Sequence, residues 1–163
     1  MAKNKEEKTN VMRVLEQKKI AYSAHTYPHE EGVAVDGVTV AQSMGFDPAI
    51  VFKTLVARGA SKQYYVFDVP VAENLDLKKA AKAVGEKSIE MIHQKELLPL
   101  TGYVHGGCSP VGMKKLFPTV FHSSAENLAA MIVSAGKIGY QVELAPHDLA
   151  ALVRAKFADI IVE

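Results

Sequence analysis

Short strand-like and helix-like segments alternate along this 163-residue chain, and no single type of element dominates it. Apolar runs and alternations typical of strands are predicted at 20–27, 50–57, 64–69, 87–91, 119–122, 131–134 and 140–144. Helical segments are predicted at 9–19, 39–45, 77–84, 93–98, 125–128 and 146–155. The order lacks the regular strand–helix–strand repeat of parallel α/β proteins. It therefore predicts an α+β fold built on a mixed sheet.

Turn and cap residues delimit several of these segments. Asp76 can cap the helix 77–84, and Gly85 can end it. Pro146 occupies the favoured first position of the helix 146–155. The polar stretch 58–63 and the glycine-containing stretch 135–139 each separate two predicted strands. Both stretches therefore predict hairpins.

The length and composition favour one domain over 1–163. The chain is 48% hydrophobic and 23% charged, with no repeat and no internal linker. Residues 3–8 form a charged lead-in without the apolar segment of a signal peptide. No run approaches the roughly 18 apolar residues of a membrane span. The single cysteine permits a reducing compartment, so we expect a cytoplasmic protein with no membrane partner.

Positive charge is concentrated in the middle of the chain. Residues 53–115 carry ten basic and six acidic side chains, a net charge of +4, between flanking sections at −1 and −2. Such a section can meet phosphate groups. The alternative is that these lysines are solvated on helix surfaces, and charge alone leaves both interpretations open.

The segment 106–115 contains the most unusual motif, Gly106-Gly107-Cys108-Ser109-Pro110. Adjacent glycines let backbone N–H groups approach a phosphate or a carbonyl oxygen closely. The segment is not a P-loop, because a methionine stands where that motif requires lysine. A plain turn between two elements remains the alternative.

Lys53 is a cation within the apolar strand-like run 51–55. Strand alternation places it on the same face as Val51 and Leu55, opposite Phe52 and Thr54. A cation on an apolar face is costly unless it is paired or lines a cavity. The alternative is that the side chain reaches along the surface to water.

Cys108 is a candidate nucleophile. A catalytic thiol needs a base, and His105 is near in sequence, but no third, orienting group is evident. A small residue filling a loop is the simpler interpretation. His25 and His29 have a zinc-binding spacing only on a helix, which the preceding strand and Pro28 exclude. We therefore expect no metal and no cofactor.

Taken together, these segments resemble the YbaK/EbsC family of prolyl-tRNA-synthetase-associated editing domains. The order and spacing of the matching pieces over more than 100 residues make the resemblance specific. The pieces are His25-Thr26-Tyr27, Phe52-Lys53-Thr54-Leu55, Asp76-Leu77-Lys78-Lys79, Gly106-Gly107-Cys108-Ser109-Pro110, Val133-Ser134-Ala135-Gly136-Lys137, Glu143-Leu144-Ala145 and Lys156-Phe157-Ala158-Asp159.

The resemblance implies a compact domain with a curved, partly barrel-like mixed sheet and helices packed around it. It also implies trans-acting hydrolysis of mischarged aminoacyl-tRNA, foremost Cys-tRNA(Pro), without a cofactor. In the implied route the cysteinyl thiol attacks its own ester carbonyl while the protein positions the substrate. The implied partners are the acceptor end of aminoacyl-tRNA and prolyl-tRNA synthetase.

The resemblance also assigns site residues. The functional lysine of the family falls on Lys53, its tyrosine on Tyr27 and its serine on Ser134. The catalytic residues expected are Lys53, Gly106 and Gly107. The substrate-binding residues expected are Tyr27, Cys108, Ser109, Ser134, Gly136, Lys137 and Gln141.

Three positions depart from the family pattern. Cys108 occupies the variable position of the Gly-Gly-x-Ser-Pro loop, which weighs against a catalytic thiol. Ile138 stands where some relatives have arginine, and Gln141 where some have aspartate. These exchanges alter the contacts expected for the amino group or the RNA end. Deacylation of alanine or another small residue, a non-catalytic binding module for tRNA or a synthetase, and a cysteine hydrolase remain alternatives.

Overall fold

The computed structural model describes residues 8–163. In this range the helices are α1 (Asn10–Gln17), α2 (Gly37–Met44), α3 (Leu77–Val84), α4 (Gln94–Thr101) and α5 (Pro146–Val153), with 3-10 turns η1 (Pro48–Ile50) and η2 (Ser123–Asn127). The strands are β1 (Ser23–Thr26), β2 (Phe52–Gly59), β3 (Tyr64–Pro70), β4 (Ile89–Met91), β5 (Thr119–His122), β6 (Met131–Ser134), β7 (Tyr140–Leu144) and β8 (Lys156–Ala158). The charged lead-in expected at 3–8 lies, except for Lys8, outside the described residues.

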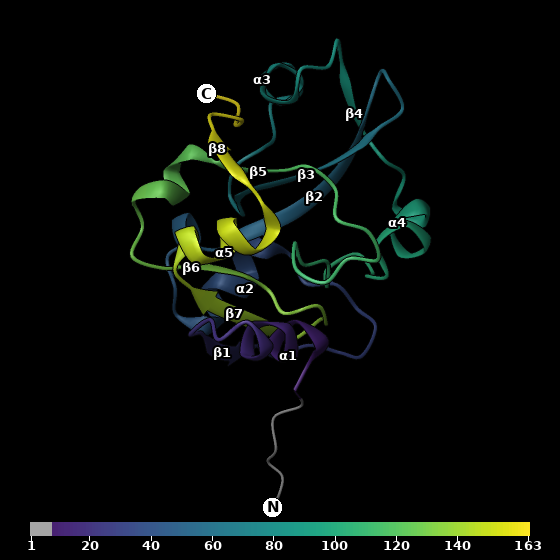
Figure 1. Ribbon diagram of the computed structural model, residues 1–163. Helices are drawn as coiled ribbons and strands as arrows, with labels where there is room; N and C mark the ends of the chain where they lie inside the picture. Colours follow the sequence, from purple (N-terminus) through teal and green to yellow (C-terminus); the bar gives the residue numbers. More distant parts are fainter. Residues whose placement is uncertain (1–7) are drawn as a thin grey trace, which may run out of the picture.

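The strands form two sheets (Figure 1). The larger has the order β4-β2-β3-β5-β8, with β2 antiparallel to β3 and β4, and β5 parallel to β3 and β8. The smaller is antiparallel, with the order β1-β7-β6. The prediction of a mixed α+β fold is confirmed. Both predicted hairpins, β2–β3 and β6–β7, are also present.

The two sheets meet at the start of β2. Val51 forms an isolated parallel bridge with Ile132 of β6, and β2 and β6 run close to each other there. Neither sheet closes on itself. The single, partly barrel-like sheet that the resemblance implies is therefore present as two sheets joined at one seam, without a closed barrel.

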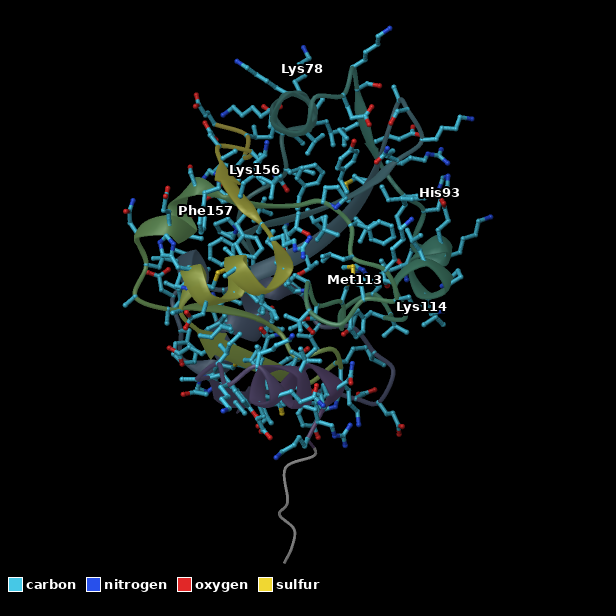
Figure 2. The ribbon with its side chains drawn as sticks, viewed as in Figure 1. Lys78, His93, Met113, Lys114, Lys156 and Phe157 are labelled. Atoms are coloured by element: carbon cyan, nitrogen blue, oxygen red, sulfur yellow. The ribbon has the colours of Figure 1, made fainter. Side chains whose placement is uncertain are left out.

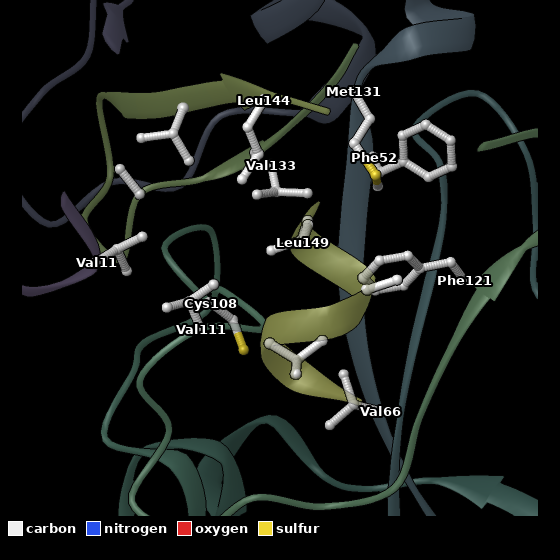
Figure 3. Packing of buried hydrophobic residues seen from close by; sticks show 14 of the residues in the cluster. Val11, Phe52, Val66, Cys108, Val111, Phe121, Met131, Val133, Leu144 and Leu149 are labelled. Carbon is white, nitrogen blue, oxygen red and sulfur yellow. The ribbon is translucent and has the colours of Figure 1, made fainter. Parts of the chain in front are cut away.

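The main hydrophobic core lies between the sheets and their covering helices (Figure 3). Leu149 of α5 is buried in the cluster that includes Phe121 of β5, Val133 of β6 and Val11 of α1. Cys108 belongs to the same cluster. The glycine-containing loop is thereby anchored to the core by its own side chains, so its backbone is held at a fixed place beside the seam.

The helices are short, and α3 and α1 lie at opposite ends of the molecule (Figure 1). Each of the five described helices has eight residues. Within 8–163 no helix has the length and apolarity needed to cross a membrane. Two exposed lysines of the basic middle section, Lys78 on α3 and Lys114 after α4, lie well apart (Figure 2).

Some boundaries differ from the sequence predictions. Helix α2 begins at Gly37, two residues before the predicted start, because the side chain of Asp36 accepts a hydrogen bond from the Thr39 amide at 3.1 Å. Helix α5 ends at Val153, earlier than predicted. The chain then forms β8, which was not predicted and which pairs with β5.

Candidate active site

A cavity of about 350 Å³ opens beside the seam between the two sheets. Its wall combines the 51–55 segment entering β2, the start of α2, the glycine-containing loop and the facing ends of β6 and β7. The volume is at the lower end of the range typical of small-molecule sites. The lining residues are Tyr27, Ala34, Val35, Asp36, Gly37, Val40, Val51, Phe52, Lys53, Thr54, Leu55, Val71, Leu97, His105, Gly106, Cys108, Ser134 and Gln141.

The cavity brings together residues that are far apart in the sequence. The sequence-predicted site residues that line it are Tyr27, Lys53, Gly106, Cys108, Ser134 and Gln141. Those that do not line it are Gly107, Ser109, Gly136 and Lys137. The second group lies in the glycine-containing loop and the β6–β7 turn, which hold the wall in place.

Lys53 supplies the cationic side chain of the cavity wall. It is half-buried on β2, opposite Val69 of β3. Burial lowers the pKa of its ammonium group, while the nearby carboxylates of Asp36 and Glu73 act in the opposite direction. Every residue from 51 to 55 lines the cavity, so the chain crosses the wall here instead of presenting one face to it. Lys53 is thus a partly desolvated cation facing a ligand-sized space.

Three polar residues of the wall come from the smaller sheet: one directly follows β1, and the other two lie on β6 and β7. Tyr27 is buried, and its backbone N–H donates to the Gly139 carbonyl at 3.0 Å. Ser134 and Gln141 are paired across the β6–β7 ladder. Gln141 is buried, and its side-chain oxygen has no hydrogen-bond partner among residues 8–163. A buried unpaired acceptor of this kind is suited to a ligand's N–H or O–H group.

The β6–β7 turn positions this part of the wall. The Gly136 amide donates to the Ser134 hydroxyl at 3.1 Å, which ties the turn to the cavity. The Lys137 ammonium group lies 5.4 Å from the centre of the Tyr140 ring. Gly136 and Lys137 therefore lie in the turn that supports the cavity wall and do not line the cavity themselves.

The glycine loop packs too closely for side chains. Gly106 has φ +90°, and a Cβ atom there would lie 2.7 Å from the Cβ of Ala34. A Cβ at Gly107 would lie 3.1 Å from the backbone nitrogen of Ile138. The loop is thus packed against the β6–β7 turn on one side and against Ala34, three residues before α2, on the other; the contact with Ala34 and the positive φ require glycine at 106, and the contact at Gly107 is tight.

Only part of the loop has amides free to bind a ligand. The Gly107 N–H donates to the Val104 carbonyl at 2.9 Å and is therefore occupied. Among residues 8–163, the N–H groups of Gly106, Cys108 and Ser109 have no such partner, and of these three residues Gly106 and Cys108 line the cavity. The Ser109 hydroxyl accepts from the Val111 amide at 3.2 Å, inside the loop. Gly107 and Ser109 hold the shape of the loop, and Gly106 and Cys108 have the amides that can donate into the cavity.

The thiol of Cys108 is held in its neutral form. Burial raises its pKa to about 12, and the charge of Asp68 acts in the same direction. A thiolate is the nucleophilic form of cysteine. The microenvironment is the opposite of the electropositive surroundings that activate a catalytic thiol.

Four polar residues of this region were not among the site residues predicted from the sequence. Asp36, Thr54 and His105 line the cavity. Asp68 lies behind Thr54, whose hydroxyl donates to its Oδ1 at 2.5 Å. The detectable signal was an acidic residue inside the apolar run 64–69, since carboxylates are rare in buried strands.

The fold and the cavity define an α+β ligand-binding domain whose pocket combines a half-buried lysine, hydroxyl groups and unoccupied backbone amides. Residues 32–152 match the model of the aminoacyl-tRNA editing domain. The chain is 46% identical over 161 residues, 98% of each chain, to the Enterococcus faecalis (strain ATCC 700802 / V583) protein named "Putative Cys-tRNA(Pro)/Cys-tRNA(Cys) deacylase EbsC".

Solved structures agree with these matches. A "putative trans-editing enzyme for prolyl tRNA synthetase" superposes with a TM-score of 0.79 at 25% identity, over 94% of this chain and 95% of that chain. Hypothetical protein APE2540 gives a TM-score of 0.82 at 18% identity, over 93% and 99%, which shows the shared fold. The chain belongs to the aminoacyl-tRNA editing-domain family and, within it, to the YbaK/EbsC type.

Proposed function

We propose that this protein is a trans-acting aminoacyl-tRNA deacylase whose main substrate is Cys-tRNA(Pro). The observation that carries the proposal is the meeting of Lys53, Tyr27 and Gly106 at one ligand-sized cavity in a chain of the editing family. The 46% identical relative, named for Cys-tRNA(Pro) and Cys-tRNA(Cys), supports the choice of amino acid. In this proposal the whole chain, 1–163, acts as a single editing domain.

The proposed roles follow from the geometry of the cavity. The Lys53 ammonium group binds a phosphate or ribose oxygen at the tRNA end as a compact point charge. The amides of Gly106 and Cys108 donate to the ester carbonyl oxygen as negative charge develops there. Tyr27, Ser134 and Gln141 form the wall that holds the aminoacyl group. Gly107 and Ser109 support the loop from behind.

The substrate supplies the nucleophile in this proposal. The cysteinyl sulfur forms a bond to its own carbonyl carbon, the bond from that carbon to the ribose oxygen breaks, and the thiol proton passes to the departing ribose oxygen. The resulting cyclic thioester takes up water and opens to free cysteine. The protein contributes orientation and oxyanion stabilisation. The neutral state of Cys108 is consistent with a route that needs no protein thiolate.

The test is release of free amino acid from purified aminoacyl-tRNA(Pro) carrying cysteine, serine, alanine or 2-aminobutyrate. We expect cysteine to be released at least tenfold faster than 2-aminobutyrate, which has a similar size and no thiol. Equal rates for cysteine and 2-aminobutyrate would overturn the substrate-assisted route. Faster release of alanine would move the preference to small residues. If no amino acid is released from any of the four substrates, the alternative of a non-catalytic binding module stands.

A further inference from the structure

A hydroxyl in the cavity wall is coupled to a carboxyl that lies behind the wall. Thr54 lines the cavity, and Asp68, its pairing partner on β3, does not. The two side chains are joined by the 2.5 Å hydrogen bond between Thr54 Oγ1 and Asp68 Oδ1. Asp68 is 0% exposed, and its Oδ2 has no partner among residues 8–163. Thr54 is therefore the group through which the state of this carboxyl reaches a ligand.

The direction of the hydrogen bond between Thr54 and Asp68 depends on whether the Asp68 carboxyl is ionised. An ionised carboxylate only accepts, so the single hydrogen of the Thr54 hydroxyl then points at Asp68, and its lone pairs are left for the cavity. A protonated carboxyl donates its own hydrogen to Thr54 Oγ1. The hydrogen of Thr54 is then released towards the cavity. Ionisation of Asp68 thus changes the Thr54 hydroxyl from a donor to an acceptor for the ligand.

We propose that Asp68 is a positioning residue that acts through Thr54, holding its hydroxyl as an acceptor so that the cavity selects aminoacyl side chains carrying a hydrogen-bond donor. This inference rests on the proposed function, because it takes the aminoacyl group as the ligand. The side chains selected are those with a hydroxyl or a thiol, against apolar groups of the same size. A site that pairs with a donor discriminates against the isostere that lacks it, because its own acceptor is then left unpaired.

The selection depends on pH. Burial raises the pKa of Asp68 to about 7, and the hydrogen bond from Thr54 opposes this shift. Few charged or titratable groups contact the Asp68 carboxyl. Cys108 interacts with Asp68 and has a pKa of about 12, so it stays neutral between pH 5.5 and 8.5. The β5 partner of Asp68 is the uncharged Phe121.

Lys53 and His105, which are among the other ionisable residues on the cavity wall, have to be separated from Asp68. Lys53 of β2 interacts with Asp36 and Glu73. His105, from the glycine-containing loop, lines the cavity as well. Neither residue shares a hydrogen bond with Thr54 or Asp68 within the described part of the chain. Comparing variants of Thr54 and Asp68 with the wild type therefore separates the contribution of the Asp68 carboxyl from the contributions of Lys53 and His105.

The experiment measures binding of two non-hydrolysable ligands, 3′-amide-linked seryl-adenosine and 3′-amide-linked 2-aminobutyryl-adenosine. They differ only by a hydroxyl in place of a methyl group, and their common α-amino group cancels in the ratio of their dissociation constants. Calorimetric titration of the full chain should give a five- to tenfold preference for the seryl ligand at pH 8.5, about the value of one neutral hydrogen bond. The preference should change below pH 6, because the seryl hydroxyl must then accept a hydrogen bond from Thr54 instead of donating one to it.

Three variants identify the residues responsible. In Asp68→Asn the side-chain amide can donate to Thr54 and does not ionise, which lowers the preference at pH 8.5 and removes its dependence on pH. Thr54→Val removes the preference itself. Thr54→Ser retains the hydroxyl, so it should retain both the preference and its pH dependence, which a purely structural role for this position would not predict. If Asp68→Asn fails to fold, the valine and serine variants still give the comparison.

An undiminished seryl preference in Asp68→Asn or Thr54→Val, or a wild-type ratio that does not change with pH, would overturn the inference. If neither ligand binds while Cys-tRNA(Pro) is deacylated, the cavity is not the aminoacyl site. In that case the inference fails and the deacylase activity stands. If the pH-dependent preference is present while no aminoacyl-tRNA is deacylated, the proposed function fails and the selectivity of the cavity stands.

Discussion

The thiol of Cys108 and the carboxyl of Asp68 are both buried, and the charge of Asp68 adds to the rise in the pKa of the thiol. Cys108 should therefore be dispensable for catalysis. We expect Cys108→Ala to deacylate Cys-tRNA(Pro) within about threefold of the wild-type rate. In the native protein iodoacetamide should label the thiol only slowly at pH 8, because alkylation needs the thiolate. A loss of more than about a hundredfold, the scale of a missing catalytic proton transfer, would restore the cysteine-hydrolase alternative.

Lys53 should matter for activity and little for stability. Its side chain is half-buried at the cavity and its pKa is lowered by burial, so removing it also removes a desolvated charge. We expect Lys53→Ala to lower the deacylation rate by at least a hundredfold while the melting temperature stays within about 3 °C. Lys78→Ala, at an exposed lysine on α3 (Figure 2), is the matched control and should leave both unchanged. Wild-type turnover in Lys53→Ala would refute the site assignment.

The buried carboxyl should make the fold less stable as pH rises. The pKa of Asp68 is raised from 3.8 to about 7 in the fold, so its stabilising contribution is complete below about pH 3.8 and is lost as pH rises to about 7. Between pH 5 and pH 8 this contribution should fall by roughly 2–3 kcal/mol, at about 1.4 kcal/mol per pH unit below the folded pKa. Urea unfolding at both pH values should show this fall in the wild type and a smaller one in Asp68→Asn. Equal falls in the two proteins would mean that Asp68 titrates normally.

Gly106 and Gly45 offer a matched pair of glycine substitutions. Both have positive φ, +90° and +79°, but a Cβ would clash with Ala34 at Gly106 and meet open space at Gly45. Gly45→Ala should cost about 1–2 kcal/mol of unfolding free energy from backbone strain alone and leave activity intact. Gly106→Ala should cost more and lower the deacylation rate at least tenfold, because the loop must shift. Equal effects on stability and rate would show that the close contact with Ala34 is unimportant.

Selectivity for tRNA(Pro) should come from a partner protein. The basic excess is mild, and Lys78 and Lys114 lie apart, so free tRNA should bind weakly and with an affinity that falls as salt rises. We expect the isolated protein to deacylate Cys-tRNA(Pro) and Cys-tRNA(Cys) at similar rates. Added prolyl-tRNA synthetase should shift the preference towards tRNA(Pro), because tethering raises the local substrate concentration. A strong tRNA(Pro) preference without the synthetase would mean that this chain reads the tRNA itself.

Local signals in the sequence were sufficient for many elements. The helix 77–84 has the predicted bounds because Asp76 caps its start and Gly85 its end, and both effects act within one helical turn. The strands 119–122, 131–134 and 140–144 also match their predictions. The resemblance to the editing family pointed to Lys53, Tyr27 and Gly106 before their positions were known, since motif order is preserved along the chain.

The sequence by itself therefore determined the fold class, most helix and strand positions, and the candidate residues. Only the tertiary structure decided that the strands form two sheets, that β8 pairs with β5, and that Asp68 lies buried behind Thr54. It also decided that the Gly107 amide is occupied by Val104. Caps and periodicity depend on neighbours a few residues away, whereas strand pairing and burial depend on contacts between distant segments. The cavity consists almost wholly of such contacts, so its chemistry became visible only in the folded chain.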